Sequence, residues 1–505
     1  MKLSALLLPD EYTSSYDPSL LEISAVETRI DRTGAGTLFI CLRGTQYDTH
    51  VLLERAAENG AAAAVVEAGA DYRVREGFPV FTVKSSRRAF AYAAYRLSGC
   101  PARKMCLVAV TGTNGKTSTA AMIAHILRAA GKQTAMIGTL GARTDKKSYP
   151  LPEGEAARQR MTTPDPDILY PLLKRLEEDG ITHVVLEASS HALAQEKLSP
   201  LRFAVGVFTN LSPEHLDYHG TMSAYLSAKA RLFSLTDAAV LNFDSDAAEE
   251  LARGIHCPVL RCGAVYHEEY NAEEIRFLNA EGISYIFRTP TSRTPISIPI
   301  PGAFTVYNSL LALTAATALG ISPEVGGAAL RSMTGVPGRL EKLPLPPDAE
   351  ISVLIDYAHT EAALRNLLVT VRGFRRGGER IVLLFGCGGD RDKSKRAPMG
   401  RVAEELADFV IITSDNSRFE EPTCIIHDIL RGMHRKDKRR VILDRRRAIT
   451  YAVESAKKGD ILLLVGKGHE TYELSEGREA PLCEKEIVLS ALKARRKKEN
   501  YANQA

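Results

Sequence analysis

The stretch Ala109–Ala121 reads AVTGTNGKTSTAA and continues the apolar run CLVAV. An apolar run, a glycine-rich turn and then helical spacing indicate a strand, a phosphate-binding loop and a helix. The loop departs from the common spacing G-x-x-x-x-G-K-[ST], because Val110 stands where the first glycine would fall. Lys116 and Thr117 keep the positions that contact the terminal phosphates and Mg²⁺ of a nucleotide. The stretch predicts a nucleotide site with a shortened loop; the alternative is a glycine-rich turn with an incidental lysine.

The composition is that of an ordinary globular protein with several domains. The chain has 505 residues, 45% of them hydrophobic and 25% charged, and its formal net charge is +4. At roughly 150 residues per domain, this length corresponds to about three domains. A net charge this small for the length does not indicate nucleic acid as a partner.

The cysteines and the apolar runs bear on the compartment. Eight cysteines are scattered and no pair has C-x-x-C spacing, so we expect reduced, mostly buried thiols in a cytoplasmic protein. The N-terminal run MKLSALLLPDEY is too short for a signal peptide. No run of about 18 apolar residues occurs, so we do not expect an integral membrane protein. The sequence does not determine the oligomeric state, and a monomer is the expectation.

The hydrophobic pattern divides the chain into three α/β domains. The runs GTLFICLRG and AAAAVVEAGA indicate a small first domain, and from Met105 short apolar runs alternate with helical patterns, as in buried parallel strands. Alternation between Glu274 and Pro301 predicts an antiparallel insertion or a sheet edge. After the break Gly335–Gly338, a second βα series is typical of a doubly wound sheet. The predicted domains are 1–104, 105–336 with a P-loop ATPase-like, mostly parallel sheet, and 337–505 with a Rossmann-like fold.

Polar side chains follow two of the predicted parallel strands. Glu187 ends the run THVVLE, and His215 lies in the segment FAVGVFTNLSPEHLDYHG after the next strand. The carboxyl ends of parallel strands meet at the ligand-binding edge of an open α/β sheet, and Mg²⁺ prefers hard oxygen ligands. Both residues are candidates for a magnesium site. The alternatives are a helix-capping carboxylate at Glu187 and a turn residue at His215.

Seven motifs, in order along the chain, resemble one family. They are TGTNGKTST, EASSHAL, FTNLSPEHLDYHGTMSAYLSAKARLF, GVPGRLE, DYAHT, FGCGGDRDKSKRAPMG and GKGHETYE. Together they span almost the whole chain and resemble the Mur ligases, most closely the UDP-N-acetylmuramoyl-tripeptide synthetases. The resemblance is weakest before residue 104.

The resemblance implies a ligase that spends ATP on a carboxylate. A carboxylate is a poor electrophile, because its leaving group would be oxide. In this family ATP phosphorylates the terminal carboxylate of a UDP-muramoyl peptide, and the amine of an amino acid displaces phosphate from the acyl phosphate. Two anions must approach each other, so cations should crowd the site.

The resemblance also implies the residues around ATP and two Mg²⁺ sites. Lys229 matches the lysine that the family carbamylates, although without the resemblance it reads as an ordinary helix-surface lysine. The implied catalytic residues are Lys116, Glu187, His215 and Lys229. The implied metal ligands are Thr117, Glu187, His215 and Lys229 as its carbamate. The implied ATP contacts are Gly112, Thr113, Asn114, Gly115, Lys116, Thr117, Ser118, Asn308, Arg339 and Asp356.

Two further groups of residues are implied to bind the other substrates. The UDP-sugar peptide is assigned to Thr28, Thr45, Gln46, Tyr47, Thr162, Thr163, Ser189, Gln195 and Lys197. Of these, Thr28 and Lys197 depart from the residues common in the family, as does Glu27, and they keep charge or a hydroxyl. The amino acid is assigned to Arg391, Asp415, Asn416, Ser417, Arg418, Gly466 and Glu470.

The loop at residues 415–418 bears on which amino acid is added. Family members that add meso-diaminopimelate usually read D-N-P-R there, whereas this chain reads Asp415-Asn416-Ser417-Arg418. The planar fork of arginine matches a carboxylate, so the retained Arg418 favours meso-diaminopimelate over L-lysine or another diamino acid. The lost proline frees φ and restores an N–H at 417.

Two other classes of protein are alternatives. One is another ligase of the superfamily, such as MurF or folylpolyglutamate synthetase, and the motifs GCGGDRDKSKR and GKGHETYE argue against it. The other is a non-catalytic, nucleotide-dependent regulator on the same scaffold. The intact Lys116, Glu187, His215 and Lys229 argue against that reading.

Overall fold

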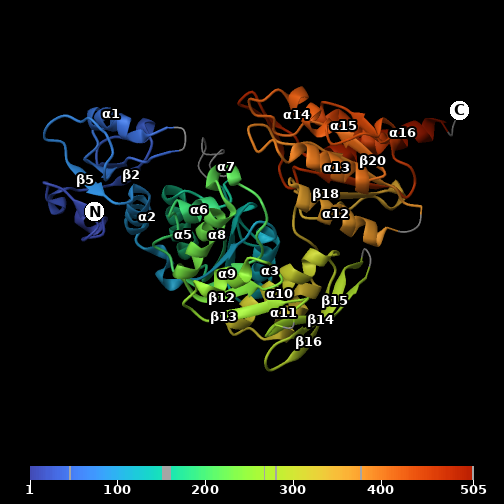
Figure 1. Ribbon diagram of the computed structural model, residues 1–505, viewed down its shortest axis with the longest axis horizontal. Helices are drawn as coiled ribbons and strands as arrows, with labels where there is room; N and C mark the ends of the chain where they lie inside the picture. Colours follow the sequence, from blue (N-terminus) through green and yellow to red (C-terminus); the bar gives the residue numbers. More distant parts are fainter. Residues whose placement is uncertain (45–46, 151–160, 267, 279–280, 376–377, 503–505) are drawn as a thin grey trace. The chain divides into compact units, whose positions relative to one another are not determined.

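The computed structural model describes residues 1–44, 47–150, 161–266, 268–278, 281–375 and 378–502 (Figure 1). The chain divides into two compact units. The first comprises Met1–Ser212, Thr221–Asn271 and Leu310–Gly326, and the second comprises Pro213–Gly220, Ala272–Ser309 and Gly327–Ala505. Both units are α/β, which confirms the predicted fold class. The domain boundaries near 104 and 336 remain predictions.

The N-terminal residues form a five-stranded sheet with the order β1-β5-β4-β3-β2. Its strands are β1 (Tyr12–Thr13), β2 (Ala25–Glu27), β3 (Thr37–Ile40), β4 (Ala63–Glu67) and β5 (Val80–Val83). β2 to β5 run parallel and β1 is antiparallel to β5. Alternate residues of the central strands face opposite cores, one covered by α1 (Leu53–Glu58) and the other by α2 (Ser86–Leu97).

The phosphate loop belongs to a mostly parallel sheet in the first unit, with the order β13-β12-β11-β6-β10-β7-β8-β9. Its strands are β6 (Cys106–Thr111), β7 (Thr134–Gly138), β8 (Gly141–Arg143), β9 (Ser148–Tyr149), β10 (His183–Glu187), β11 (Phe203–Phe208), β12 (Thr236–Asn242) and β13 (Val259–Gly263). The helices of this region are α3 (Lys116–Ala129), α5 (Pro166–Glu178), α6 (Ser190–Ala194), α8 (Met222–Ala230) and α9 (Ala248–Arg253). β6 pairs in parallel with β10, with Val110 opposite Glu187, so the ends of these two strands lie side by side at one edge.

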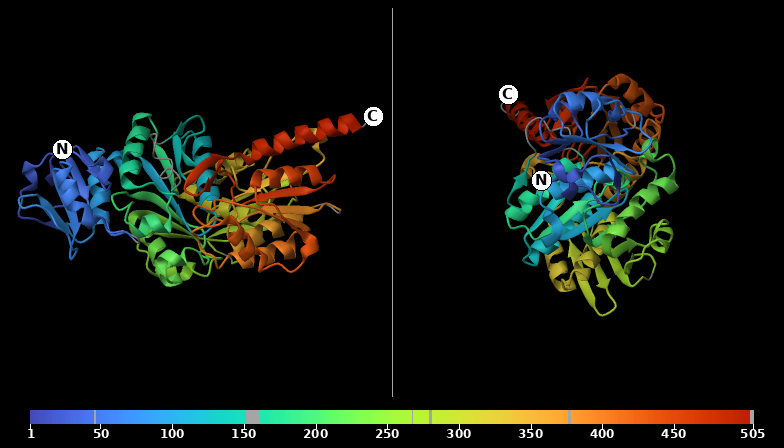
Figure 2. Two further views of the ribbon diagram at one scale, coloured as in Figure 1. Left: turned by 90° about the horizontal axis from the view of Figure 1, so that it is seen from above. Right: turned by 90° about the vertical axis from the view of Figure 1, so that its left-hand side faces the viewer.

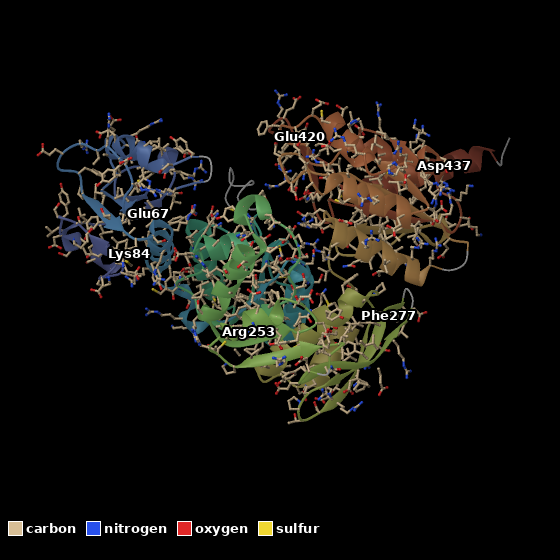
Figure 3. All side chains as sticks on the ribbon, viewed as in Figure 1. Glu67, Lys84, Arg253, Phe277, Glu420 and Asp437 are labelled. Carbon is tan, nitrogen blue, oxygen red and sulfur yellow. The ribbon has the colours of Figure 1, made fainter. Side chains whose placement is uncertain are left out.

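The antiparallel pairing predicted for residues 274–301 is confirmed. β15 (Ile283–Arg288) pairs antiparallel with β16 (Arg293–Ile298), and β14 (Tyr270–Phe277) precedes them. Phe277 at the end of β14 is exposed and is labelled in Figure 3. α10 (Ala303–Ala318) and α11 (Pro323–Arg331) follow these strands along the chain, and the short α7 (Leu216–His219) precedes α8.

The C-terminal residues form the predicted doubly wound sheet, with six strands in the order β17-β18-β22-β19-β20-β21. The strands are β17 (Glu341–Lys342), β18 (Ser352–Asp356), β19 (Ile381–Phe385), β20 (Phe409–Ile412), β21 (Arg439–Val441) and β22 (Ile461–Val465). All neighbours are parallel except β17 with β18. A separate hairpin pairs β23 (Tyr472–Ser475) with β24 (Arg478–Pro481).

Helices cover both faces of this C-terminal sheet. Alternate strand residues such as Leu383 and Leu463 pack in one core, against α12 (Glu361–Phe374), α13 (Arg396–Leu406) and α14 (Pro422–Leu430). Leu384 and Leu464 pack in the opposite core, against α15 (Arg445–Ser455) and α16 (Glu484–Ala502). Figure 2 shows α16 as the long helix that ends the chain. Within the described ranges, no helix is long and apolar enough to span a membrane.

Candidate active site

The loop between β6 and α3 is shorter than a standard phosphate loop because β6 continues through the position of the missing glycine. Val110 is fully buried inside the strand, and the turn occupies only residues 112–115. Gly112 has a φ of 144° and Gly115 a φ of 84°, conformations that side-chain-bearing residues rarely adopt. A β-carbon at Gly112 would also overlap the hydroxyl oxygen of Thr209. Both glycines are therefore required by the backbone.

Residues after β11 hold this loop from the side. The N–H of Thr113 donates to Asn210 O at 2.9 Å, and the N–H of Asn114 donates to Asn210 Oδ1 at 3.0 Å. The hydroxyl of Thr209 donates to Asn114 O at 2.6 Å. Asn210 thus accepts from two backbone amides of the loop. The first intrahelical bond runs from Thr119 N to Gly115 O, so the amides of residues 115–118 form the helix N-terminus available to an anion.

The side chain of Lys116 lies over its own loop. Its Nζ donates to Gly112 O at 2.9 Å and to Thr113 O at 2.8 Å. The ammonium therefore sits above the turn that follows β6, beside the start of α3. A cation at this place adds to the positive end of the helix dipole.

Glu187 is fully buried at the end of β10 and is satisfied by two threonines. Its Oε2 accepts from the hydroxyls of Thr117 at 2.9 Å and Thr139 at 3.0 Å, and its Oε1 accepts from Thr139 N at 3.0 Å. A β-carbon at Gly138 would overlap the Glu187 side chain, so the glycine makes room for the carboxylate. One carboxylate and two hydroxyls are hard oxygen donors of the kind that Mg²⁺ prefers, and these side chains suit that ion.

Thr139 is not among the residues predicted from the sequence, although the sequence contains a signal for it. Thr139 directly follows the buried run of β7, as Glu187 ends that of β10. Polar residues at the end of a buried parallel strand are candidates for the binding edge. The same criterion that selected Glu187 would have selected Thr139.

Three of the residues assigned to the UDP-sugar peptide, Thr162, Thr163 and Ser189, lie beside Glu187. Thr163 donates its hydroxyl to Glu187 O at 2.7 Å and accepts from Ser189 N at 3.0 Å. The hydroxyls of Thr162 and Thr139 are 3.3 Å apart. These hydroxyls form a continuous polar rim around the buried carboxylate.

The remaining residues assigned to the UDP-sugar peptide are more dispersed. Lys197 is buried, and its Nζ pairs with Asp165 Oδ1 at 2.7 Å. Gln195 caps the C-terminus of α6, Thr28 is half-buried after β2, and Tyr47 is exposed. Thr45 and Gln46 lie outside the described residues.

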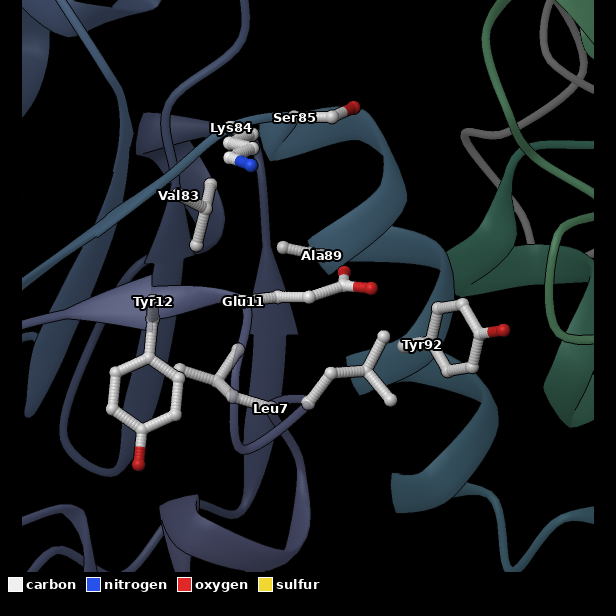
Figure 4. A pocket seen from close by; sticks show the side chains of 9 residues that line it. Leu7, Glu11, Tyr12, Val83, Lys84, Ser85, Ala89 and Tyr92 are labelled. Carbon is white, nitrogen blue, oxygen red and sulfur yellow. The ribbon is translucent and has the colours of Figure 1, made fainter.

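The N-terminal sheet has a small cavity of about 20 Å³. Its lining includes Glu11, Lys84 and Tyr92 (Figure 4). This volume holds about one water molecule. The cavity therefore does not correspond to a nucleotide-sugar site.

Lys229 is buried. The interpretation of Lys229 as an ordinary helix-surface lysine, made without the family resemblance, is therefore wrong. It is 1% exposed near the end of α8, and its Nζ lies 4.2 Å from the centroid of the Tyr225 ring. The Tyr225 hydroxyl in turn lies 3.2 Å from Thr113 Oγ1, so Lys229 is linked to the phosphate loop through one aromatic ring.

His215 belongs to the second of the two compact units. It directly precedes α7 and has a φ of 57°. The neighbouring Glu214 contacts His359 Nε2 at 3.0 Å through Oε1. In the described part of the chain, no three His, Cys, Asp or Glu side chains converge as a ready-made metal site. The four-residue ligand set therefore remains a prediction, and Thr117 with Glu187 is the pair that the structure brings together.

The residues assigned to ribose and phosphate meet at the start of the C-terminal sheet. Asp356 ends β18 and accepts from Leu340 N at 2.6 Å and Ala358 N at 2.7 Å. Burial raises the pKa of Asp356, while the nearby Arg339 acts in the opposite direction. The Arg339 guanidinium lies 4.6 Å from the centroid of the Tyr357 ring.

Asn308, assigned to adenine, is buried within α10.

Asn416 is the centre of a polar network at the edge of the C-terminal sheet. Its Oδ1 accepts from Lys467 Nζ at 2.8 Å and from Leu474 N at 3.0 Å, and its Nδ2 donates to Glu470 Oε2 at 2.8 Å. The two donors fix the orientation of the amide, so its N–H points at the carboxylate. Lys467 was part of the quoted motif GKGHE but was not singled out, although it is fully buried.

Two carboxylates in this network have opposite pKa shifts. Burial raises the pKa of Asp415, but Lys467 and Arg445 outweigh burial and the net shift is downward. Burial and the neighbouring Asp415 raise the pKa of Glu470. A β-carbon at Gly466 would approach Asp415 Oδ2 to 2.5 Å. Glycine at this position therefore keeps the space around the carboxylate open.

Arg418 and Arg391 place two cations beside these carboxylates. Arg418 Nη1 donates to Gly389 O at 2.8 Å and to Asn416 O at 3.2 Å. Burial lowers the pKa of Arg418, and the nearby positive charge of Arg391 lowers it further. Two like charges held together are stabilised by a bound anion. This edge of the sheet therefore has cations that could pair with the carboxylate of a ligand, and carboxylates that could pair with its ammonium group.

A buried ion pair joins the two loops that carry these arginines. Arg396 is fully buried, and its Nη1 and Nη2 bond to Glu420 Oε1 at 2.7 Å and Oε2 at 2.8 Å. Arg396 Nη2 also donates to Gly388 O at 3.3 Å, and Asp390 N donates to Glu420 at 3.2 Å. Glu420 is labelled in Figure 3. The pair fastens residues 388–390 to residue 420, beside Arg418.

Comparison with known proteins agrees with this geometry. The protein-family model of the Mur ligase middle domain matches residues 110–316. The family model of the Mur ligase glutamate ligase domain matches residues 338–468. The UDP-N-acetylmuramoyl-L-alanyl-D-glutamate–2,6-diaminopimelate ligase of Syntrophomonas wolfei is 37% identical over 482 residues, which cover 94% of this chain and 95% of that protein. The protein of the same name from Gloeobacter violaceus is 39% identical over 483 residues, with 94% and 95% coverage.

Solved structures give the same result. A structure of a UDP-N-acetylmuramoyl-L-alanyl-D-glutamate–2,6-diaminopimelate ligase aligns with a TM-score of 0.66 at 29% identity, and covers 95% of this chain and 97% of that one. MurF of Thermotoga maritima, in complex with ADP, shares the fold with a TM-score of 0.59 at 18% identity, and covers 95% and 99%. The fold and the loop define a nucleotide-dependent α/β ligase. The chain belongs to the Mur ligase family.

The Arg396–Glu420 pair makes stability depend on pH. The hydrogen bonds from Arg396 lower the pKa of Glu420 from 4.5 to about 2. Since the folded-state pKa is depressed, the stabilisation is complete above the ordinary pKa and is lost as the pH falls toward 2. We expect the free-energy gap between wild type and Glu420→Gln, measured by urea unfolding, to shrink from about pH 6 to about pH 3.

The matched control is Glu361→Gln at the exposed start of α12. It makes the same chemical change on a surface helix, and its gap from wild type should change less with pH. A constant gap for Glu420→Gln across this range would contradict the role of the ion pair.

Proposed function

We propose that this chain joins 2,6-diaminopimelate, in its meso form, to UDP-N-acetylmuramoyl-L-alanyl-D-glutamate with conversion of ATP to ADP and phosphate. The observation that carries the proposal is the edge of the C-terminal sheet, where Arg418 and Arg391 stand beside Asp415 and Glu470. A diaminopimelate has two carboxylates and two ammonium groups, so it can pair with both signs of charge. The names of the two relatives described above specify these same two substrates.

ATP binding is proposed at the loop between β6 and α3. Residues 112–118 would receive the phosphates, with the helix N-terminus and Lys116 facing the negative charge. Asn308 is proposed to contact adenine, Arg339 a phosphate and Asp356 the ribose. Arg339 follows the glycine-rich segment Gly335–Gly338, a placement suited to a residue that engages ATP when a domain closes.

The chemistry has two steps. A terminal carboxylate oxygen of the UDP-muramoyl peptide attacks the γ-phosphorus of ATP, and ADP leaves. The unprotonated amine of the amino acid then attacks the acyl carbon, the C–O bond breaks and inorganic phosphate leaves with the amide formed. Lys116 would stabilise the negative charge on the transferring phosphoryl group. Electrostatic stabilisation of this kind is a main contribution of the protein to phosphoryl transfer.

Magnesium is proposed to be held by Thr117, Glu187, His215 and the carbamate of Lys229, in two sites. When bound, Mg²⁺ neutralises phosphate charge and aligns the reacting oxygens. A carbamate forms when the Lys229 amine adds to CO₂ and releases a proton, and it converts a buried cation into an oxygen ligand. Burial favours this change, because an unmodified ammonium beside the metal would repel it.

The UDP-sugar peptide is proposed to contact Thr28, Thr45, Gln46, Tyr47, Thr162, Thr163, Ser189, Gln195 and Lys197. Thr162, Thr163 and Ser189 support this best, because they rim the buried carboxylate where the reacting end of the peptide must lie. Lys197 supports it least, since it already pairs with Asp165. The domains would be 1–104 for the UDP-sugar, 105–336 for ATP and 337–505 for the amino acid. Eight free thiols are typical of the cytoplasm, which we propose as its location.

The charge arrangement favours diaminopimelate over L-lysine. Both amino acids have a distal ammonium that Glu470 could pair with, but only diaminopimelate has a distal carboxylate. Arg418 is half-buried and lies beside the positive charge of Arg391. Diaminopimelate would bring a carboxylate to these two cations, whereas L-lysine would leave them without that counter-ion. L-lysine would therefore bind more weakly.

The assay that tests the proposal uses ATP, Mg²⁺, UDP-N-acetylmuramoyl-L-alanyl-D-glutamate and one amino acid at a time. We expect one phosphate released per product, and a product whose mass has increased by diaminopimelate less water. Phosphate release with L-lysine but not with diaminopimelate would overturn the choice of amino acid. Release of AMP and pyrophosphate would overturn the reaction.

Arg418→Ala should act on the amino acid alone. Loss of a bidentate arginine–carboxylate pair costs about 2–4 kcal/mol, so the KM for diaminopimelate should rise about 30- to 700-fold. The KM for ATP should change little. The control Arg435→Ala removes an exposed arginine that pairs with Asp437 on the surface. An equal rise in both KM values for Arg418→Ala would contradict its role.

Lys229→Ala should abolish the carbamate. We expect activity to fall by at least about 100-fold, as for loss of a metal-site group, and to recover partly with acetate or another short carboxylate. Lys174→Ala, which removes an exposed lysine on α5, is the control and should keep full activity. Loss of activity without any rescue, together with no ¹³C signal from bound ¹³CO₂ in the wild type, would exclude the carbamate.

A further inference from the structure

The hairpin β23–β24 lies against the loop that carries Arg418. We propose that this hairpin positions Arg418, through a hydroxyl pair between Ser417 and Ser475, and thereby sets the affinity for the carboxylate of the amino acid. The inference rests on the proposed function for its substrate, but its structural part can be tested separately.

The backbone of Arg418 is held in a conformation that its side chain disfavours. Its φ is 55°, in the left-handed region where a β-carbon crowds the carbonyl oxygen. The N–H of Arg418 donates to Leu474 O at 3.0 Å, and its carbonyl accepts from Glu476 N at 2.5 Å. Two residues of the hairpin therefore hold the peptide groups on both sides of this residue.

The hairpin has a tight turn of defined geometry. Ser475 pairs with Arg478, and the two turn residues between them, Glu476 and Gly477, have φ values of 49° and 70°. Two positive φ values define the tight turn that matches the twist of paired strands. The position of Glu476 N is therefore fixed by the hairpin, and the carbonyl of Arg418 follows it.

Side chains add a second set of bonds along the same line. Ser417 is 2% exposed, and its hydroxyl lies 3.2 Å from Ser475 Oγ. The hydroxyl of Ser414 donates to Glu473 Oε1 at 2.7 Å. Asn416 is joined to Leu474 as described above. Three residues of the loop thus bond to the strand β23 before Arg418 is reached.

The direction of the Arg418 guanidinium depends on this backbone. Its Nη1 is bonded to the carbonyls of Gly389 and Asn416, so the fork keeps its plane only while residues 416–418 keep theirs. A planar fork binds a carboxylate through two parallel bonds, and displacement of such a group by about 1 Å weakens binding strongly. Loosening the hairpin contact should therefore weaken binding of diaminopimelate while ATP binding is unaffected.

The experiment compares Ser475→Ala with Ser475→Thr. Ser475 is half-buried on a strand, so threonine retains the hydroxyl in a residue suited to strands. Loss of one hydroxyl bond should raise the KM for diaminopimelate about 3- to 10-fold for Ser475→Ala, with Ser475→Thr close to wild type. Ser417→Ala should match Ser475→Ala, and the double variant should be no worse than either one, because both remove the same bond.

The control is Ser455→Ala, whose exposed hydroxyl donates to Tyr451 O in its own helix. It should leave every KM unchanged. The KM values for ATP and the UDP-muramoyl peptide should stay within about twofold of wild type in all variants. Equal changes in all three KM values, or additive effects in the double variant, would overturn the inference.

Amide hydrogen exchange tests the anchoring without turnover. The amides of Leu474 and Glu476 donate to Asn416 and Arg418, so they should exchange faster in Ser475→Ala than in Ser455→Ala. Unchanged exchange would overturn the anchoring role. If the wild type did not ligate diaminopimelate at all, the proposed function would fail, whereas faster exchange would still support the structural part.

Discussion

A carboxylate buried at the end of a parallel strand is unfavourable unless polar groups satisfy it. Glu187 meets this requirement through Thr117 and Thr139, which supply two hydroxyls and one backbone N–H. These bonds connect the first turn of α3 with the ends of β7 and β10, so the helix N-terminus and the acidic side chain keep a fixed geometry. The proposed roles of ATP, magnesium and the reacting carboxylate all depend on this contact.

The C-terminal sheet holds buried charges of both signs at one edge. Asp415, Glu470, Lys467 and Arg418 gather at this edge. Lys467 lies within 4 Å of both carboxylates and offsets part of the repulsion between them. Asn416 links Lys467 to Glu470. Lys467 donates to the amide oxygen of Asn416, and the amide nitrogen then donates to Glu470 and orients its carboxylate. This arrangement supports the proposed selection of an amino acid with charges of both signs at its far end.

The sequence predicted the strands and the phosphate loop because those features are local. Runs such as VVLE and the turn from Gly112 to Gly115 specify their own conformation. The contacts of Asn210 with the loop, the burial of Lys229 and the bond between Ser417 and Ser475 join residues far apart in sequence. Spacing along one chain does not contain such pairings, so they required the structure.

The most direct test of the mechanism is isotope transfer. UDP-N-acetylmuramoyl-L-alanyl-D-glutamate labelled with ¹⁸O in its terminal carboxylate would be converted with ATP, Mg²⁺ and diaminopimelate, and the inorganic phosphate analysed by mass spectrometry. We expect one ¹⁸O atom in each phosphate, because the oxygen that attacks the γ-phosphorus leaves with it. Phosphate without label would contradict the formation of an acyl phosphate.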